Sequence, residues 1–257
     1  MRTIKTITLL GAGNVANHLG KALLNNGFSI NQVYSKSIDN TYILASELNA
    51  MPCDDTKFLT NESDLYLVCI KDDFIEEIVN QLLFTNKMVA HTSGSVAMDI
   101  LSKFDNYGIL YPLQTFSKDK EVTISDVPFC IEANNATNEQ TLLELGKKLS
   151  NSVHKINSEQ RKTIHLAAVF ACNFSNHMYA IAENILTQNN LDFSLLKPLI
   201  LETAKKVQNN TPSTIQTGPA IRNDDDVIKN QLEMLADSKD YQDIYKLITD
   251  NIIDGKL

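Results

Sequence analysis

The stretch Thr6-Ile7-Thr8-Leu9-Leu10-Gly11-Ala12-Gly13-Asn14-Val15-Ala16 decides the fold of this 257-residue chain. Its first five residues form a short apolar run that is typical of a buried strand. The next six match the pattern G-x-G-x-x-A, and residues 15–26 then repeat apolar side chains at helical spacing up to Gly27. A strand, a glycine turn and a helix in this order predict the first half of a β-α-β unit.

Each small residue of the glycine turn has a physical reason to be there. Gly11 allows the sharp turn from strand to helix, Gly13 has no Cβ to hold a phosphate away from the backbone, and Ala16 permits close helix–strand packing. The free N–H groups at the helix start attract an anion. The turn therefore predicts a pyrophosphate site, whereas the alternative is a glycine turn that binds nothing. The candidate cofactor-binding residues here are Gly11, Ala12, Gly13, Asn14 and Val15.

The end of the predicted second strand, residues 32–35, indicates which dinucleotide binds. NAD-binding domains carry an acidic residue there that accepts hydrogen bonds from the ribose 2′-hydroxyl. Here the first acidic residue is Asp39, in the next turn, and the strand end offers Ser35, Lys36 and Ser37. Two hydroxyls and a cation suit a 2′-phosphate, so we expect NADP(H), with NAD(H) as the alternative cofactor. Lys36 is expected to contact the phosphate, and a solvated loop lysine is the alternative.

The alternation of strand and helix continues along the first 156 residues. Short apolar runs separated by helical patterns imply right-handed crossovers and a largely parallel sheet. The expected fold class is α/β, a Rossmann-type mostly parallel sheet followed by an all-α C-terminal domain. Predicted strands cover residues 6–10, 32–35, 65–70, 88–90, 107–110, 128–133 and 153–156, and predicted helices cover 15–26, 42–48, 74–83, 96–104 and 139–149.

The character of the chain changes after Ile156. No strand pattern follows, and residues 161–187 form a long helical pattern rich in Ala, Leu, Ile and Phe. Two domains are therefore expected, a dinucleotide-binding Rossmann domain at 1–156 and an all-helical domain at 157–257. Further helical patterns cover residues 193–208, 224–236 and 240–253, with a kink or a late start expected at Pro198.

Composition excludes several classes of partner. Lys and Arg number 23 and Asp and Glu number 31, which gives a net charge of −8. Nucleic acid and anionic membrane surfaces are bound by clustered cations, so neither is expected as a partner. No apolar run approaches the roughly 20 residues of a spanning helix. The four cysteines lack C-x-x-C spacing, which is typical of a reduced, cytoplasmic protein and predicts no metal site.

Three polar segments follow predicted strands, where the carboxyl ends of parallel strands meet and ligands bind. Ile70 and Lys71 are expected to bind the cofactor beside its ribose, with a plain surface role as the alternative for Lys71. In His91-Thr92-Ser93-Gly94-Ser95, a helix start with two hydroxyls suits a substrate carboxylate or carbonyl, or is simply a helix cap. Gln114 and Thr115 are expected to line the same cleft, or to form a structural turn.

Polar residues in apolar or acidic surroundings complete the candidate site. His91 is a candidate proton donor because the ordinary pKa of histidine lies near neutrality, or else it is a buried, hydrogen-bonded residue. His165 and Asn173 interrupt the apolar background of the long helical pattern. Arg222 could hold a substrate carboxylate in a bidentate fork, or pair with the acidic residues 224–226. The candidate catalytic residues are therefore His91, Ser93, His165 and Asn173.

The order of these motifs resembles a known family. The glycine turn, Val68-Cys69-Ile70-Lys71-Asp72, residues 91–95, residues 111–116 and the all-helical second half succeed one another along the chain. Together they resemble a Rossmann-like NADP oxidoreductase family whose C-terminal domain has no assigned function, related to pyrroline-5-carboxylate reductase and the β-hydroxyacid dehydrogenases. The resemblance covers essentially the whole chain. It implies a homodimer formed through the helical domain and a small-molecule substrate bound between the two domains.

The resemblance to the β-hydroxyacid dehydrogenases is incomplete. Their substrate-binding turn, Ser-Gly-Gly, is matched here by Ser93 and Gly94, with a serine in the third position. Their long helix bears a catalytic lysine followed four residues later by asparagine, whereas Lys162 is followed by Leu166. The β-hydroxyacid reaction itself is therefore not implied.

These observations predict an NADP-dependent oxidoreductase that transfers hydride between the nicotinamide and a small imino, oxo or hydroxy acid. Ser93 would orient the substrate, and His91 or His165 would handle the proton. Two alternatives remain. The missing lysine favours a non-catalytic NAD(P)-binding sensor or scaffold protein, and a deazaflavin-dependent NADP reductase would need no proton donor.

Overall fold

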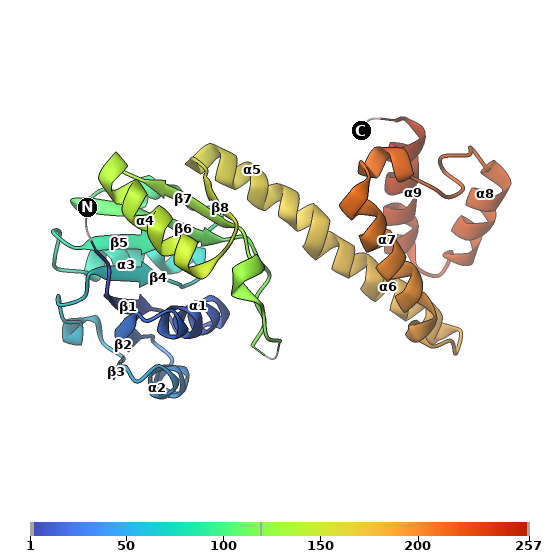
Figure 1. The fold of residues 1–257 in the computed structure, drawn as a ribbon. Helices are drawn as coiled ribbons and strands as arrows, with labels where there is room; N and C mark the ends of the chain where they lie inside the picture. The colour runs from blue at the N-terminus through green and yellow to red at the C-terminus, as the bar shows by residue number, and fades with distance from the viewer. Residues whose placement is uncertain (1–2, 119, 256–257) are drawn as a thin grey trace. The chain divides into compact units, whose positions relative to one another are not determined.

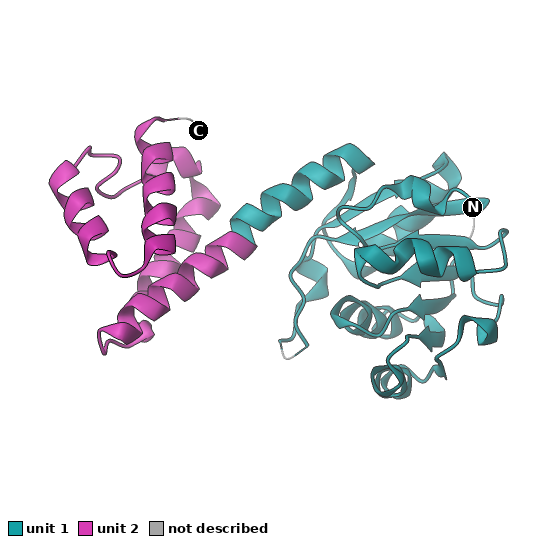
Figure 2. Ribbon diagram, turned by 180° about the vertical axis from the view of Figure 1, so that it is seen from behind, with its two compact units in different colours: residues 1–172 teal, residues 173–257 magenta. Residues whose placement is uncertain are grey.

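The computed structural model describes residues 3–118 and 120–255, and it contains two compact units, residues 1–172 and 173–257 (Figure 2). The first unit holds an eight-stranded sheet with the order β3-β2-β1-β4-β5-β6-β7-β8 (Figure 1). Neighbouring strands are parallel except β6 and β7, which confirms the Rossmann-type, mostly parallel prediction. The strands are β1 Thr6–Leu10, β2 Ser29–Tyr34, β3 Met51–Cys53, β4 Leu65–Val68, β5 Met88–His91, β6 Asn106–Pro112, β7 Phe129–Ala133 and β8 Val153–Lys155.

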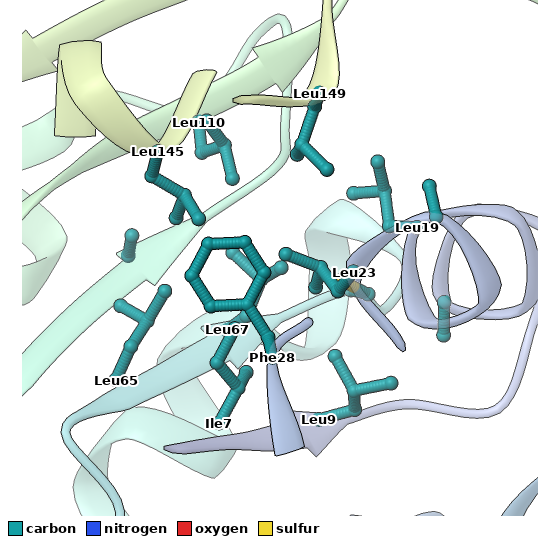
Figure 3. Packing of buried hydrophobic residues seen from close by; sticks show 14 of the residues in the cluster. Ile7, Leu9, Leu19, Leu23, Phe28, Leu65, Leu67, Leu110, Leu145 and Leu149 are labelled. Atoms are coloured by element: carbon teal, nitrogen blue, oxygen red, sulfur yellow. The ribbon is translucent and has the colours of Figure 1, made fainter. Parts of the chain in front are cut away.

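Helices cover both faces of this sheet because successive strand residues point to opposite sides. Leu9 packs with the helices α1 and α4, whereas its neighbour Leu10 packs with α3. Figure 3 shows the first of these clusters, in which Leu23 and Leu145 approach the strands from α1 and α4. The sheet is thereby buried on both faces, as its continuous apolar strands require. The helices of this unit are α1 Asn14–Asn25, α2 Ile38–Glu47, α3 Ile75–Gln81, α4 Ala136–Leu149 and α5 Ser158–Ala168.

The structure differs from the sequence prediction at two elements of this unit. The helix expected over residues 96–104 is only a 3₁₀ turn at Met98–Leu101, because the preceding residues are held in a tight hydrogen-bonded turn. The short strand β3 was not predicted. Its three residues include Pro52 and offer too little alternation to be seen as a strand.

In the described residues of the second unit every regular element is a helix, as predicted. A π-helical stretch, Val169–Phe174, leads from α5 into α6 and spans the division between the units. Pro198 lies in the first turn of α7, which confirms the late start expected for that helix. No helix in residues 3–118 and 120–255 has the length and apolar character needed to cross a membrane. The helices are α6 Ser175–Gln188, α7 Lys197–Asn209, α8 Asp225–Met234 and α9 Lys239–Ile253.

The division between the compact units lies within a helical stretch, after Cys172. The last strand, β8, ends at Lys155, next to the boundary expected at residue 156. Helix α5 belongs to the first unit because its residue Arg161 is fully buried there and bonded to Glu132 of β7. The functional boundary at residue 156 stays a prediction.

Candidate functional site

The glycine turn has the shape that a pyrophosphate requires. Gly11 adopts a φ of +130°, and a Cβ there would lie 2.2 Å from the carbonyl oxygen of Cys69. Gly13 has an ordinary φ of −84°, and a Cβ there would meet no atom within 4 Å. Helix α1 starts at Asn14 without a side-chain cap, so its first N–H groups are available to an anion. The local geometry therefore fits a dinucleotide.

A cavity of about 830 Å³ opens beside this turn, within the range of small-molecule and cofactor sites. It brings together the predicted cofactor-binding residues from three strand ends. These are Gly11, Ala12, Gly13, Asn14, Val15, Ser35, Lys36, Ser37, Ile70 and Lys71, and Gln114 lines the cavity as well. The sequence assigned no role to the further lining residues Tyr34, Asn40, Cys69, Phe74, Ile78, Phe116 and Lys118.

Lys36 is held at the wall of this cavity by an acidic partner. Its Nζ lies 2.7 Å from Glu77 Oε1 and 5.7 Å from the centre of the Phe74 ring. The hydrogen bond to Glu77 raises the pKa of Lys36, and the same bond lowers the pKa of Glu77. Lys36 is therefore charged, but its charge is shared with a carboxylate.

The predicted residues Ser35 and Ser37 lie in the same turn. Ser35 Oγ accepts the Ser37 N–H at 3.2 Å, and Asn40 Nδ2 donates to Ser37 Oγ at 2.9 Å. Both serines line the cavity with Lys36. The turn therefore presents hydroxyl groups beside a cation, as a 2′-phosphate site needs.

His91 lies at the end of β5 and is completely buried. Its Nδ1 accepts the N–H of Ser93 at 3.1 Å, so the proton of the neutral ring lies on Nε2. In the described parts of the chain, Nε2 has no hydrogen-bond partner of ordinary geometry. Burial, and then the charge of Arg161, lower the pKa of His91 to about 4. A neutral, buried ring is the second of the two interpretations that the sequence left open.

Ser93 acts locally as the cap of its turn. Its Oγ accepts the N–H groups of Ser95 at 3.1 Å and Val96 at 3.0 Å. Ser95 Oγ in turn donates to the carboxylate of Asp72, which follows β4. These bonds fix the hydroxyls at the carboxyl end of the sheet, where a ligand is expected, and contact with substrate remains a prediction.

A tyrosine that the sequence left without a role contacts one of the candidate histidines. Tyr111 Oη, at the end of β6, lies 3.1 Å from Nδ1 of His165 in α5. Gly94 makes this possible, because a Cβ there would lie 2.6 Å from His165 Nδ1. Burial raises the pKa of Tyr111 to about 12, so its hydroxyl is protonated and able to donate. The first unit therefore holds a tyrosine–histidine pair beside the 91–95 turn.

A buried ion pair supports this region. Arg161 is fully buried, and its Nη1 lies 2.7 Å from Glu132 Oε2 while Nη2 donates to the Val96 carbonyl. Its Nε has no partner among the described residues. No pattern in the sequence indicated a buried role for this arginine, because a charged residue in a helical pattern is usually solvated.

The remaining candidates lie elsewhere. Asn173 is the first residue of the second unit and is exposed within the π-helical stretch. Arg222 Nη2 lies 3.8 Å from Asp224 Oδ2, which is the acidic pairing that the sequence offered as its alternative role. Thr115 donates its N–H to Gln114 Oε1. No group of three or more His, Cys, Asp or Glu in the described parts of the chain is arranged to hold a metal ion.

Comparison with known proteins places these features in a family. Residues 6–97 match the family described as NADP oxidoreductase coenzyme F420-dependent, and residues 127–252 match a domain of unknown function, DUF2520. The structure of a "putative NADP oxidoreductase" from Bacteroides fragilis is 42% identical, covers 98% of each chain and has a TM-score of 0.92. No protein of curated function matches at a significant level.

More distant solved structures share the fold. An imine reductase from Myxococcus stipitatus, solved with NADP⁺, is 14% identical with a TM-score of 0.63, and the match covers 97% of this chain and 92% of the reductase chain. A 1-pyrroline-5-carboxylate reductase from Streptococcus pyogenes is 14% identical with a TM-score of 0.64, and the match covers 99% of this chain and 100% of the reductase chain. By its 42% identity to this Bacteroides fragilis relative over nearly the whole of both chains, the chain belongs to the NADP oxidoreductase family, and its own residues 127–252 form a DUF2520 region.

Proposed function

We propose that this chain is an NADP-dependent reductase of a small imino or oxo acid, or acts in reverse on the corresponding amine or hydroxy acid. The observation that carries the proposal is the cavity beside the glycine turn, where an open backbone, two serines and a lysine converge. Hydride transfer is the chemistry that NADP(H) supplies when bound. Family membership and the NADP⁺-bound imine reductase support the same cofactor.

The chain's own residues divide the remaining work. Gly11 to Val15 would hold the pyrophosphate, and Ser35, Lys36 and Ser37 would hold the 2′-phosphate. Ile70 and Lys71 would contact the ribose beside the reacting ring. Ser93 would orient the substrate through its hydroxyl.

The proton would come from the Tyr111–His165 pair rather than from His91. With a pKa of about 4, His91 is neutral at physiological pH and has no proton to give as an imidazolium. Tyr111 keeps its proton and would give it to substrate, the Nδ1–H of His165 would hold the resulting phenolate through their contact, and water would return a proton to the tyrosine.

Turnover tests this proposal directly. Purified protein is mixed with NADPH and a panel of cyclic imines and oxo acids, and the absorbance of reduced nicotinamide is followed. Oxidation of NADPH that depends on one class of acid supports the proposal. Binding of NADPH without turnover across a broad panel would instead favour the sensor or scaffold alternative.

A deazaflavin-dependent activity is the second candidate, because residues 6–97 match a family described by that coenzyme. In this case the partner in hydride transfer would be a second cofactor and no acid substrate would be needed. Oxidation of NADPH by a deazaflavin, with no response to imino or oxo acids, would support it.

We also propose a homodimer formed through the second unit. Among its described residues only Ala220 and Thr249 are buried, whereas large apolar side chains such as Leu195, Leu199 and Leu201 are 55–65% exposed. A unit with so little buried apolar surface gains too little from burial to stay folded alone. A second copy would cover these side chains.

The mass in solution tests the dimer. Light scattering should give twice the chain mass of 28.7 kDa. Leu199→Glu should shift the protein towards monomer, whereas Lys205→Glu on the same helix should not. A wild-type monomer would contradict the dimer.

A further inference from the structure

A segment far along the chain lies over the glycine turn. Residues 114–118, which follow β6 and are called the strap here, contact the first turns of α1. Asn14 Nδ2 donates to the Phe116 carbonyl at 2.9 Å, and His18 Nε2 donates to the Ser117 carbonyl at 2.9 Å. The His18 and Phe116 rings stack with centroids 4.9 Å apart. The strap is therefore fixed to the helix that begins at the pyrophosphate turn.

These contacts bring Lys118 to the wall of the cofactor cavity. Its Nζ donates to Asn40 Oδ1 at 2.9 Å, and Asn40 Nδ2 donates to Ser37 Oγ at 2.9 Å. Lys118 and Asn40 line the same cavity as Lys36 and Ser37. A chain of two hydrogen bonds thus joins Lys118 to the turn that was expected to hold the 2′-phosphate.

The two lysines differ in how much charge they offer to a ligand. Lys36 is paired with the Glu77 carboxylate at 2.7 Å. Lys118 contacts a neutral amide and forms no ion pair with a residue in the described parts of the chain. A phosphate approaching Lys36 must compete with Glu77, whereas one approaching Lys118 displaces only an amide oxygen.

We propose that Lys118 is a second cation for the 2′-phosphate of NADP(H), carried to the site by the strap and positioned by Asn40. The inference rests on the proposed function, since it names a recognition residue of the same cavity. It places a determinant of cofactor choice about 80 residues beyond the turn after β2, in a loop that the glycine motif does not indicate. His18 is a positioning residue, because it contacts the strap and is not proposed to contact the phosphate.

Binding of matched ligand pairs tests the assignment. Dissociation constants are measured calorimetrically for NADPH and NADH, and for adenosine 2′,5′-bisphosphate and adenosine 5′-monophosphate. Lys118→Ala should weaken NADPH and the bisphosphate about tenfold, in keeping with the loss of one charge-assisted hydrogen bond. NADH and the monophosphate should change less than twofold. Lys118 is exposed, so the variant should fold, and ligand-free thermal unfolding checks this.

Two further variants complete the test. Lys120→Ala is the matched control, because Lys120 lies two residues away and lines a different cavity, and it should leave all four constants unchanged. His18→Ala should weaken NADPH in the wild-type background but have little further effect in Lys118→Ala, since it acts through the strap. The salt dependence of NADPH binding should also be shallower in Lys118→Ala.

The outcomes separate this inference from the function on which it rests. If wild-type protein prefers NADPH but Lys118→Ala binds it within twofold as tightly, the role of Lys118 is wrong and the proposed function stands. If Lys118→Ala weakens NADH as much as NADPH, the side chain does not read the 2′-phosphate. If the wild type binds neither dinucleotide, both proposals fall.

Discussion

The hydroxyl of Tyr111 lies 3.1 Å from Nδ1 of His165, with Gly94 packed against both rings. The contact joins the end of a central strand to helix α5 at the carboxyl side of the sheet, where a bound ligand is expected. This contact is the one that the proposed proton transfer would use, and no stretch of sequence displays it.

Tyr111→Phe should lower kcat by about 100-fold and leave KM within a few fold, because a positioned proton donor typically contributes that much to a rate. Burial raises the pKa of Tyr111 to about 12, so no loss of activity below pH 10 should come from its ionisation. Tyr107→Phe, in the same strand, is the control. Steady-state kinetics across pH with the substrate found by the panel check this, and an unchanged kcat would exclude the role.

Gly11 and Gly13 should respond differently to the same substitution. Gly11→Ala places a Cβ 2.2 Å from the Cys69 carbonyl at a φ of +130°, so it should destabilise the fold by about 2 kcal/mol or more and lower Tm. Gly13→Ala meets no atom within 4 Å, so Tm should be unchanged while NADPH affinity falls. Thermal unfolding and calorimetry separate the two effects. Equal Tm values for both variants would contradict the geometry.

Acid should destabilise the protein through His91. Its pKa falls from 6.5 to about 4 on folding, so between these values the unfolded chain binds more protons and stability drops as pH falls. The contribution should be about 2 kcal/mol between pH 7 and pH 5. His91→Gln should flatten this part of the profile in urea unfolding. If the His91→Gln profile kept the wild-type slope, His91 would be protonated as easily in the folded protein as in the unfolded chain, and the predicted effect would be wrong.

Removing the partner of Arg161 should be costly. Glu132→Gln leaves a fully buried guanidinium without its counter-charge and should lower the free energy of unfolding by about 3 kcal/mol. Asp224→Asn, in the exposed pair with Arg222, is the control and should change it by less than about 0.5 kcal/mol. Urea denaturation of both variants decides whether the buried pair holds α5 to the sheet, and equal effects would argue against it.

The features predicted correctly from the sequence are those that a short-range pattern of residues determines. Gly11, Gly13 and the apolar runs of β1 and β4 specify the glycine turn and the parallel sheet, because these depend on local spacing. Pro198 likewise marks the start of α7. The sequence did not predict the three-residue strand β3 or the 3₁₀ turn at Met98–Leu101, because both elements are too short to show a periodic pattern.

The rest of the site depends on contacts between distant parts of the chain. Lys118 and Asn40 are 78 residues apart, and Tyr111 and His165 are 54 apart. Arg161 looks like a solvated helix residue until the structure shows Glu132 beside it. No spacing rule connects such residues, so their roles emerge only once the sheet order is known.

The cavity beside Gly11 is proposed to bind NADP(H) in preference to NAD(H). Calorimetric titration of the wild-type protein with NADPH and NADH in the same buffer measures this preference. We expect saturable binding of NADPH that is at least tenfold tighter than that of NADH, because Lys36 and Lys118 are both proposed to contact the 2′-phosphate. Tighter binding of NADH, or no binding of either dinucleotide, would contradict it.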